Sequence, residues 1–148
     1  MMRGYPIDLM QDEDGSYLAT CPVLPEVTTF GGSPASALSH SIGAVEEAIA
    51  GRIADWDELP APREMQESDR GGFAPLPLQT LIKAELYRLV RSKGMTRADV
   101  VERLGGPREQ VDDLFSLDRP SGLEQIEAAL KAADAEIDVN VRPLAEAS

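Results

Sequence analysis

The spacing of apolar and polar positions changes along the chain, from a period of two near the start to a helical period further on. In residues 5–10, Tyr, Ile and Leu alternate with Pro, Asp and Met, and an extended pattern resumes over residues 17–21 after an Asp-Glu-Asp-Gly-Ser turn. Two such runs around a turn predict a β-hairpin. Neighbouring prolines favour a loop over residues 23–26, and a third strand is expected over residues 27–30.

Helical spacing begins after this strand. Ser33 is suited to cap a helix with Pro34 in its first position, and the apolar spacing continues to about Trp56. Residues 59–77 are rich in proline, glycine and charge and have no period, which predicts a linker. A second helix is expected over residues 78–93. Its predicted buried stripe is Leu81, Ile82, Leu86, Leu89 and Val90.

Residues 96–117 predict two short helices joined by a glycine-containing turn. Thr96 can cap the first helix, Gly105 follows its last apolar position, and Pro107 opens the second helix. Two short helices joined this tightly are typical of a helix-turn-helix, which presents its second helix to the major groove of DNA. The apolar positions are Val100, Val101 and Leu104 in the first helix, and Val111, Leu114 and Phe115 in the second.

The end of the chain returns to a period of two. Ser121 with Glu124 three residues later predicts a capping box for a last helix. In residues 137–141, apolar and polar side chains then alternate, which predicts a strand with one apolar face. Because a lone strand is not stable, we hypothesise that it pairs with the same strand of a second copy of the chain.

These elements predict an α+β protein with two domains. The first, residues 1–58, combines a β-sheet with one helix. A linker follows at residues 59–77. The second domain, residues 78–148, is all-helical with a terminal β-strand.

Charge is distributed unevenly between these parts. The formal net charge is −12. Residues 1–75 carry 4 basic and 13 acidic side chains, a balance of −9, whereas residues 76–148 carry 10 and 13, a balance of −3. The acidic part suits a basic protein partner, and only the second part is a plausible DNA binder. A single cysteine excludes an internal disulfide and a zinc-ligand set, and the absence of a long apolar run predicts a cytoplasmic protein without a membrane segment.

Taken together, the chain resembles a HicB-type antitoxin over nearly its full length, with a C-terminal Xre/Cro-like helix-turn-helix. The resemblance rests on the order of four segments: YPIDLMQDEDGSYLATCPVLPEV, GGSPASALSHSIGAVEEAIA, PLPLQTLIKAELYRLVRSKGMTRADVVERL and GLEQIEAALKAADAEIDV.

The resemblance implies an antitoxin and autorepressor without catalytic residues, cofactor or metal. Its first domain would have a partial ribonuclease-H-like fold that binds and blocks a HicA-like, RNA-cleaving toxin protein, and its second domain would bind operator DNA as a homodimer or higher homo-oligomer. An acidic first domain agrees with this, because an RNA-binding toxin should have a basic surface, which acidic side chains complement in charge. The residues expected to face the toxin are Tyr5, Asp12, Glu13, Asp14, Tyr17 and Glu26.

The residues expected at DNA belong to the predicted helix-turn-helix. Arg108 begins the second helix, where base edges are contacted, and Arg97 is placed for a phosphate. The alternative is that both arginines are solvated surface charges. Asp112 and Asp113 stand near where related sequences often have Asn and Arg, although an aspartate can accept a hydrogen bond from cytosine N4. The full set of candidates is Thr96, Arg97, Arg108, Gln110 and Asp112.

Other interpretations are weaker. The chain could be a one-component repressor whose first domain senses a small molecule. It could also be a metal-dependent nuclease, but the acids at positions 8, 12, 14, 46 and 47 do not converge in sequence. The Asp12-x-Asp14-Gly15 run lacks the remaining ligands of a calcium loop, so a hairpin turn is expected there. His40 and Cys21 have no partner set for catalysis, and Trp56 is either a core anchor or a toxin contact.

Overall fold

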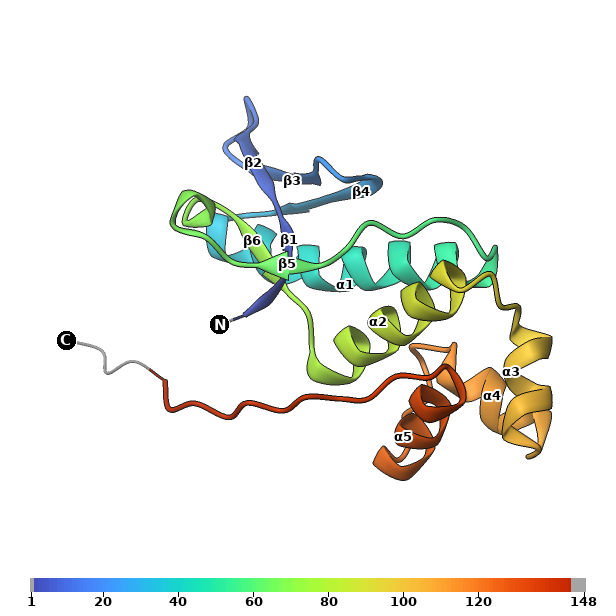
Figure 1. Ribbon diagram of the computed structural model, residues 1–148. Coiled ribbons are helices and arrows are strands. Elements are labelled where there is room, and N and C mark those ends of the chain that lie inside the picture. The colour runs from blue at the N-terminus through green and yellow to red at the C-terminus, as the bar shows by residue number, and fades with distance from the viewer. Residues whose placement is uncertain (1, 145–148) are drawn as a thin grey trace.

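The computed structural model describes residues 2–144, in which two small antiparallel sheets and five α-helices form an α+β fold (Figure 1). Residues 145–148 of the predicted second domain lie outside the described residues. No helix in residues 2–144 is long and apolar enough to cross a membrane. The elements are β1 (Arg3–Pro6), β2 (Asp8–Gln11), β3 (Tyr17–Cys21), β4 (Leu24–Gly31), α1 (Pro34–Ala54), β5 (Arg63–Glu64), a 3-10 turn (Glu67–Asp69), β6 (Phe73–Pro75), α2 (Leu78–Ser92), α3 (Arg97–Leu104), α4 (Arg108–Leu114) and α5 (Leu123–Ala132).

The first sheet has the strand order β2-β3-β4. It confirms the predicted hairpin, and α1 packs on the face that carries the buried residues Ala19 and Val27. The predicted loop over residues 23–26 is wrong, because β4 already begins at Leu24. Pro25 fits there since β4 is an edge strand, in which one backbone N–H can be missing.

Helix α1 forms where the sequence predicts it. The Ser33 hydroxyl accepts a hydrogen bond from the Ser36 N–H at 3.1 Å, and Pro34 occupies the first helical position. Gly31, at the end of β4, lies against the first turn of the helix, where an added Cβ would be 2.2 Å from the Ala37 nitrogen. The glycine therefore allows the tight connection that lays α1 back on the sheet.

The predicted linker at residues 59–77 is wrong for most of its length, because this segment builds the second sheet. β1 lies between β5 and β6, with Arg3 opposite Glu64 and Tyr5 opposite Ala74. Ala74 is fully buried and β6 packs on α1. The first structural unit therefore extends to about residue 75 and is joined to α2 by only two residues.

Helix α2 buries a different face from the predicted one. Leu86 and Val90 are buried as expected, but Lys83 and Tyr87 are buried beside them. Leu81, Ile82 and Leu89, which the spacing placed in the core, remain half-buried. The difference arises because Tyr87 packs on the end of α1, while Lys83 reaches the end of α4.

The last helices follow the predicted order, but the capping residue of α5 lies one position later than predicted. Helix α5 begins at Leu123 with Gly122 as its cap, and the Gly122 N–H donates to Gln125 Oε1 at 3.1 Å. The predicted capping box from Ser121 and Glu124 is therefore wrong by one position. After α5 the chain runs back along α2 (Figure 1). Residues 137–144 form no regular strand within the single chain.

Candidate functional site

The face of the β2-β3-β4 sheet that points away from α1 carries a row of apolar side chains. The strand register places Met10 opposite Leu18, and Leu18 opposite Phe30. Met10 is 65% exposed, Phe30 is 51% exposed and Leu18 is half-buried between them. Three adjacent apolar side chains on an otherwise solvated sheet face are typical of a protein-binding surface. We call Met10, Leu18 and Phe30 the apolar row.

The turn between β2 and β3 adds acidic groups near this row. Asp12, Glu13 and Asp14 are exposed, as expected for a partner-facing turn. Asp14 Oδ1 accepts hydrogen bonds from the Ser16 hydroxyl at 2.6 Å and the Ser16 N–H at 3.0 Å, and both lower the pKa of the Asp14 carboxyl. Gly15 has a φ of +88°. Together with the antiparallel pairing of β2 and β3, these contacts confirm the expected hairpin turn.

Two predicted toxin-facing tyrosines do not lie on this surface. Tyr5 is 1% exposed, its hydroxyl donates to the Pro60 carbonyl at 2.7 Å, and burial raises its pKa. Tyr17 is half-buried and packs against the core. Burial leaves Tyr5 no surface for a partner in this structure, whereas Tyr17 keeps part of its surface exposed and stays a candidate.

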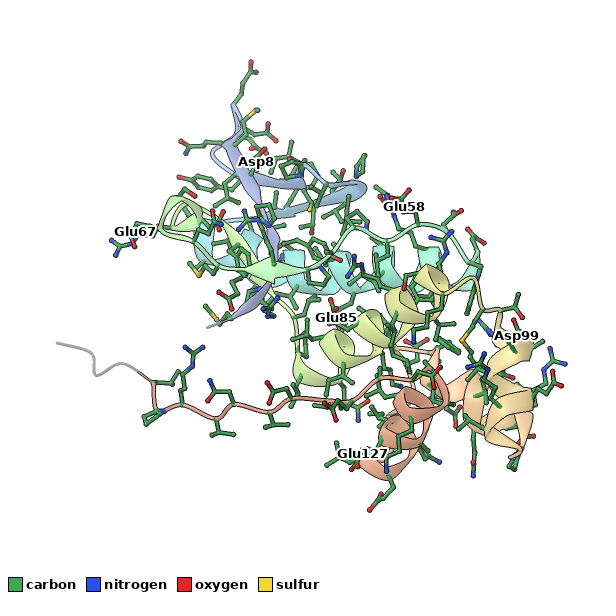
Figure 2. The ribbon with its side chains drawn as sticks, viewed as in Figure 1. Asp8, Glu58, Glu67, Glu85, Asp99 and Glu127 are labelled. Atoms are coloured by element: carbon green, nitrogen blue, oxygen red, sulfur yellow. The ribbon has the colours of Figure 1, made fainter. Side chains whose placement is uncertain are left out.

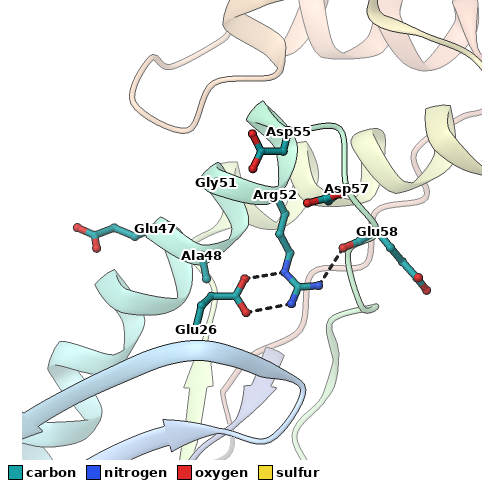
Figure 3. Close-up of a pocket in the computed structure, with 8 residues that line it drawn as sticks. All are labelled: Glu26, Glu47, Ala48, Gly51, Arg52, Asp55, Asp57 and Glu58. Carbon is teal, nitrogen blue, oxygen red and sulfur yellow. Dashed lines mark hydrogen bonds and ion pairs between the residues drawn. The ribbon is translucent and has the colours of Figure 1, made fainter.

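Glu26 lies at the opposite end of β4, in an acidic groove beside α1 (Figure 3). Its two carboxylate oxygens accept hydrogen bonds from Arg52 at 2.7 and 2.9 Å, and these lower the pKa of Glu26. Arg52 also donates to the Glu58 carbonyl at 2.9 Å. Glu26 therefore joins β4 to the end of α1, and the groove is completed by Glu47, Ala48, Gly51, Asp55 and Asp57.

Helices α3 and α4 form the predicted pair with a glycine turn. Thr96 and Asp99 make a reciprocal capping box, with contacts of 2.8 and 3.2 Å. Gly105 ends α3 with a φ of +65°, a conformation that glycine adopts without strain. Thr96 thus caps a helix, whereas Arg108 and Gln110 are exposed on the first turn of α4. Those two side chains are available to an external partner.

Arg97 is held in place by its neighbours. Its guanidinium lies 5.6 Å from the ring centres of both Trp56 and Phe115, and it forms an ion pair with Asp112 at 3.6 Å. Trp56 itself meets Tyr87 and Phe115 edge-on, with ring centres 5.0 and 5.3 Å away. Trp56 is therefore a half-buried anchor that packs the end of α1 against α2 and against Phe115, which follows α4, in agreement with the core alternative.

The acidic pair on α4 is balanced by arginines. Asp112 pairs with Arg97, and Asp113 lies 3.4 Å from Arg119. Beneath them, the buried Lys83 ammonium donates to the backbone carbonyls of Asp113, Ser116 and Arg119. Burial lowers the pKa of Lys83, and the Asp113 carboxylate opposes this shift. Lys83 thereby satisfies carbonyls at the end of α4 that would lack partners.

The described acids do not assemble a metal site. Figure 2 shows Asp8, Glu67 and Asp99 on well-separated parts of the molecule. In residues 2–144, no group of three or more His, Cys, Asp or Glu side chains is placed to hold a metal ion. Cys21 is buried, and burial raises the pKa of its thiol. His40 Nδ1 lies 2.7 Å from the Phe30 carbonyl oxygen on the exposed end of the sheet.

The apolar row was not predicted from the sequence. Met10 stands in the polar half of the alternation in residues 5–10, and this was the available signal, since a large apolar residue in that half must face away from the core. Phe30 gave no such signal alone, because the predicted strand over residues 27–30 is too short to show which of its faces is buried. Its orientation follows only once Val27 is known to face α1.

Comparison with known proteins supports one class of protein. No protein-family model matches the chain. The chain is 24% identical to "Antitoxin HicB" of Escherichia coli (strain K12) over 91% of this chain and 96% of that protein. It is 29% identical to "Antitoxin HicB" of Pseudomonas fluorescens (strain Pf0-1) over 88% of each, and 20% identical to "Antitoxin HicB 1" of Photorhabdus laumondii over 93% of this chain and 86% of that protein.

This similarity supports an antitoxin role in a toxin–antitoxin system. More specifically, it supports a HicB-type antitoxin.

Proposed function

We propose that this protein neutralises a HicA-like, RNA-cleaving toxin by direct binding and represses its own operon through α3 and α4. The observation that carries the proposal is the extent of the similarity to HicB antitoxins, which covers 88–93% of the chain in the relatives named above and therefore both structural units. The proposal includes no catalysis and no cofactor, and places the protein in the cytoplasm with its toxin and operator.

The surface best suited to the toxin is the apolar row with the acidic β2–β3 turn beside it. Exposed apolar side chains supply the desolvated centre that protein interfaces need, and surrounding charges supply orientation and fast association. A toxin that binds RNA needs a basic surface, and the net charge of −9 over residues 1–75 complements it. Carboxylates of the turn then occupy positions that RNA phosphates would take.

For operator DNA, the exposed first turn of α4 is the best candidate. Arg108 and Gln110 are of the residue types that contact guanine and adenine edges. The arginine partners of Asp112 and Asp113 reduce the repulsion that these carboxylates would exert on phosphates. A homodimer would place two copies of α4 on two half-sites, as paired recognition helices require.

Co-expression with the neighbouring open reading frame tests the antitoxin role. We expect the neighbour alone to arrest growth and degrade RNA, and co-expression to restore growth and yield a co-purifying complex. A one-component repressor would instead leave growth unchanged in every arm. Purified protein incubated with RNA and Mg²⁺ or Mn²⁺ tests the absence of catalysis, and cleavage would contradict that part of the proposal.

A gel shift with the DNA upstream of the gene tests repression. We expect a sequence-specific complex that survives an excess of unrelated DNA. Binding of equal strength to both DNAs would contradict an operator-reading role.

A further inference from the structure

Strand β4 is an edge of the β2-β3-β4 sheet, and the hydrogen bonds of the hairpin fix which of its backbone groups face outward. In an antiparallel pair, opposite residues alternate between hydrogen-bonded and non-hydrogen-bonded pairs. The Asp12 N–H donates to the Ser16 carbonyl at 2.7 Å, at the start of the ladder between β2 and β3. Two positions further along, Met10 and Leu18 are therefore a hydrogen-bonded pair, and the Leu18 backbone groups are directed at β2.

The outward backbone groups of β4 belong to Thr28 and Phe30. Phe30 lies opposite Leu18, whose N–H and C=O are used by β2, so Phe30 directs its own groups to the free edge. Thr28, two residues earlier, shares this direction. An independent contact agrees, because the Phe30 carbonyl oxygen lies 2.7 Å from Nδ1 of His40, a side chain of α1. Within residues 2–144, this leaves the Thr28 N–H, the Thr28 C=O and the Phe30 N–H without a backbone partner.

This part of β4 lacks the features that usually protect a sheet edge. Natural edge strands tend to be short or to carry charges, proline or a bulge. In β4, Pro25 and the ion pair of Glu26 with Arg52 occupy the first part, where the register also shifts. Residues 28–30 are Thr-Thr-Phe, an uncharged sequence with high strand propensity. An accessible edge of this composition can take up a further strand.

The opposite edge of the sheet is less suited to strand addition. β2 has only four residues, with the exposed Asp8 at its start and the acidic turn directly after its end. Short length and flanking charges both protect an edge. Before β2, the Ile7 N–H donates to the Gly72 carbonyl at 3.1 Å, and the chain continues into the other sheet. β4 is therefore the better edge for a partner strand.

We propose that the Thr28–Phe30 edge of β4 takes up a β-strand of the toxin, which extends the β2-β3-β4 sheet by one strand. This deepens the proposed function and rests on its toxin partner. The apolar row supports the proposal, because it crosses the sheet from Met10 through Leu18 and stops at Phe30 on the free edge. A strand added there would bring a side chain to about 4.5–5.5 Å from Phe30 and continue the row.

Charge favours a basic toxin over a second copy of this chain as the occupant. The acidic turn at residues 12–14 lies at the end of the sheet where β4 carries Phe30, because Tyr17, soon after the turn, pairs with Gly31. Residues 1–75 have a net charge of −9. Two copies joined at this edge would bring two such acidic units together, whereas a basic surface would be attracted. The added strand would then gain affinity from backbone hydrogen bonds and orientation from the turn.

Amide hydrogen exchange in the full-length protein, followed residue by residue by NMR, tests the pairing. We expect the Thr28 and Phe30 amides to exchange rapidly in the free protein and to slow about tenfold or more when the purified toxin is added. Thr29 is the internal control, because it forms a hydrogen-bonded pair with Ala19 and should be protected in both states. Exchange at Thr28 and Phe30 that the toxin leaves unchanged would overturn the proposal.

A proline substitution provides a second readout. Thr28→Pro removes one outward N–H and leaves the ladder with β3 intact, as proline on an edge strand can. Thr28→Val is the matched control, because it keeps the N–H and the branched shape. By isothermal titration, Thr28→Pro should weaken toxin binding about tenfold or more and Thr28→Val less than about threefold. Wild-type affinity in Thr28→Pro, or an equal loss in both variants, would contradict pairing at this edge.

The outcomes separate this inference from the proposed function. Wild-type protein that does not bind the toxin would overturn both. Toxin binding with unprotected edge amides would overturn the strand addition alone and leave the apolar row as the interface. Protection that appears when the protein is concentrated without toxin would assign the edge to a second copy. Far-UV circular dichroism checks folding of the variants, and the exchange experiment on wild type decides if Thr28→Pro does not fold.

Discussion

Arg97, the first residue of α3, lies over the indole ring of Trp56, which follows α1, with 5.6 Å between the guanidinium carbon and the ring centre. A candidate DNA contact is thus held by a side chain of the unit that we propose binds the toxin. The same arginine contacts Phe115 and Asp112 of the α4 region. The two units therefore share a packed junction, and a substitution on one side of it should alter the packing of the other side.

Replacing Trp56 tests this junction. Trp56→Ala removes two edge-on aromatic contacts and should lower the free energy of unfolding by about 2–4 kcal/mol, since the ring is half-buried. Urea unfolding followed by far-UV circular dichroism measures it. Trp56→Phe, which keeps a ring, should lose clearly less. Equal stability of Trp56→Ala and wild type would show that the junction contributes little.

Arg108 is the sharpest test of DNA binding. Arg108→Ala should weaken operator binding by about 1–3 kcal/mol in a gel shift, if the side chain contacts a base edge, and should leave toxin binding unchanged. Glu109→Gln is the matched control, because this exposed neighbour on the same turn carries an acid and its neutralisation should not weaken binding. A loss of affinity in the control that equals the loss in Arg108→Ala would indicate a general effect on α4.

Phe30 tests the toxin-binding surface. Phe30→Ser should weaken the toxin complex about tenfold or more, because the ring provides exposed apolar area that a partner would bury. Thr28→Ser changes the next residue on the same sheet face and serves as the control. Isothermal titration with the purified toxin measures both. Unchanged affinity for Phe30→Ser would move the interface away from the apolar row.

Asp69 predicts a pH dependence of stability. Hydrogen bonds from Arg63 at 2.6 and 2.8 Å, with one from the Gln66 N–H, lower the pKa of Asp69 from 3.8 to about 2. The folded state therefore favours the ionised carboxylate, so this stabilisation is complete above pH 4 and is lost as the pH falls toward 2. In chemical unfolding between pH 4 and 2, Asp69→Asn should show a shallower decline than wild type.

A control for Asp69 is available in the same turn. Glu67 pairs with Arg70, but both side chains are largely exposed, at 80% and 77%. Exposed pairs contribute little to stability. Glu67→Gln should therefore follow the wild-type pH profile. An Asp69→Asn profile that also follows wild type would show that the Arg63 contact does not stabilise the fold.

Lys83 should stabilise the unit formed by α2, α3, α4 and α5 against unfolding. Lys83→Met keeps the approximate length of the side chain but removes the donor of three part-buried hydrogen bonds to the backbone carbonyls of Asp113, Ser116 and Arg119. We expect a loss of about 2–4 kcal/mol in the free energy of unfolding. Lys93→Met is the comparison, because its ammonium donates to the Ala133 carbonyl alone. A smaller effect at Lys83 than at Lys93 would contradict this role.

Features that depend on neighbouring residues, such as helix caps and helix ends, could be predicted from the sequence. Ser33 and Thr96 cap the helices they were expected to cap, because a short hydroxyl side chain reaches the N–H groups of the first turn. Gly105 ends α3 for an equally local reason. The capping box of α5 failed only because Gln125 also reaches the chain before the helix, so that Gly122 takes the cap.

Features that depend on distant partners could not be predicted. β5 and β6 have two and three residues, too few to show a period of two, and they exist because β1 pairs with both. Lys83 did not belong to the predicted buried stripe of its helix, but backbone carbonyls 30 to 36 positions away accept hydrogen bonds from its ammonium and hold it in the interior. Tyr5 was expected to face a partner, and the Pro60 carbonyl satisfies its hydroxyl inside the core instead.

The central position of β1 constrains the order in which this protein can be built. Arg3 and Glu64, which meet across the β1–β5 pair, are 61 positions apart, and both neighbours of β1 lie beyond residue 62. β1 leaves the ribosome before both of its neighbours and must therefore wait for about 60 further residues before its hydrogen bonds close, and such long-range closure is slow. A truncated fragment that ends at residue 58 leaves β1 without either neighbour, so the shortest self-sufficient fragment must reach past residue 75.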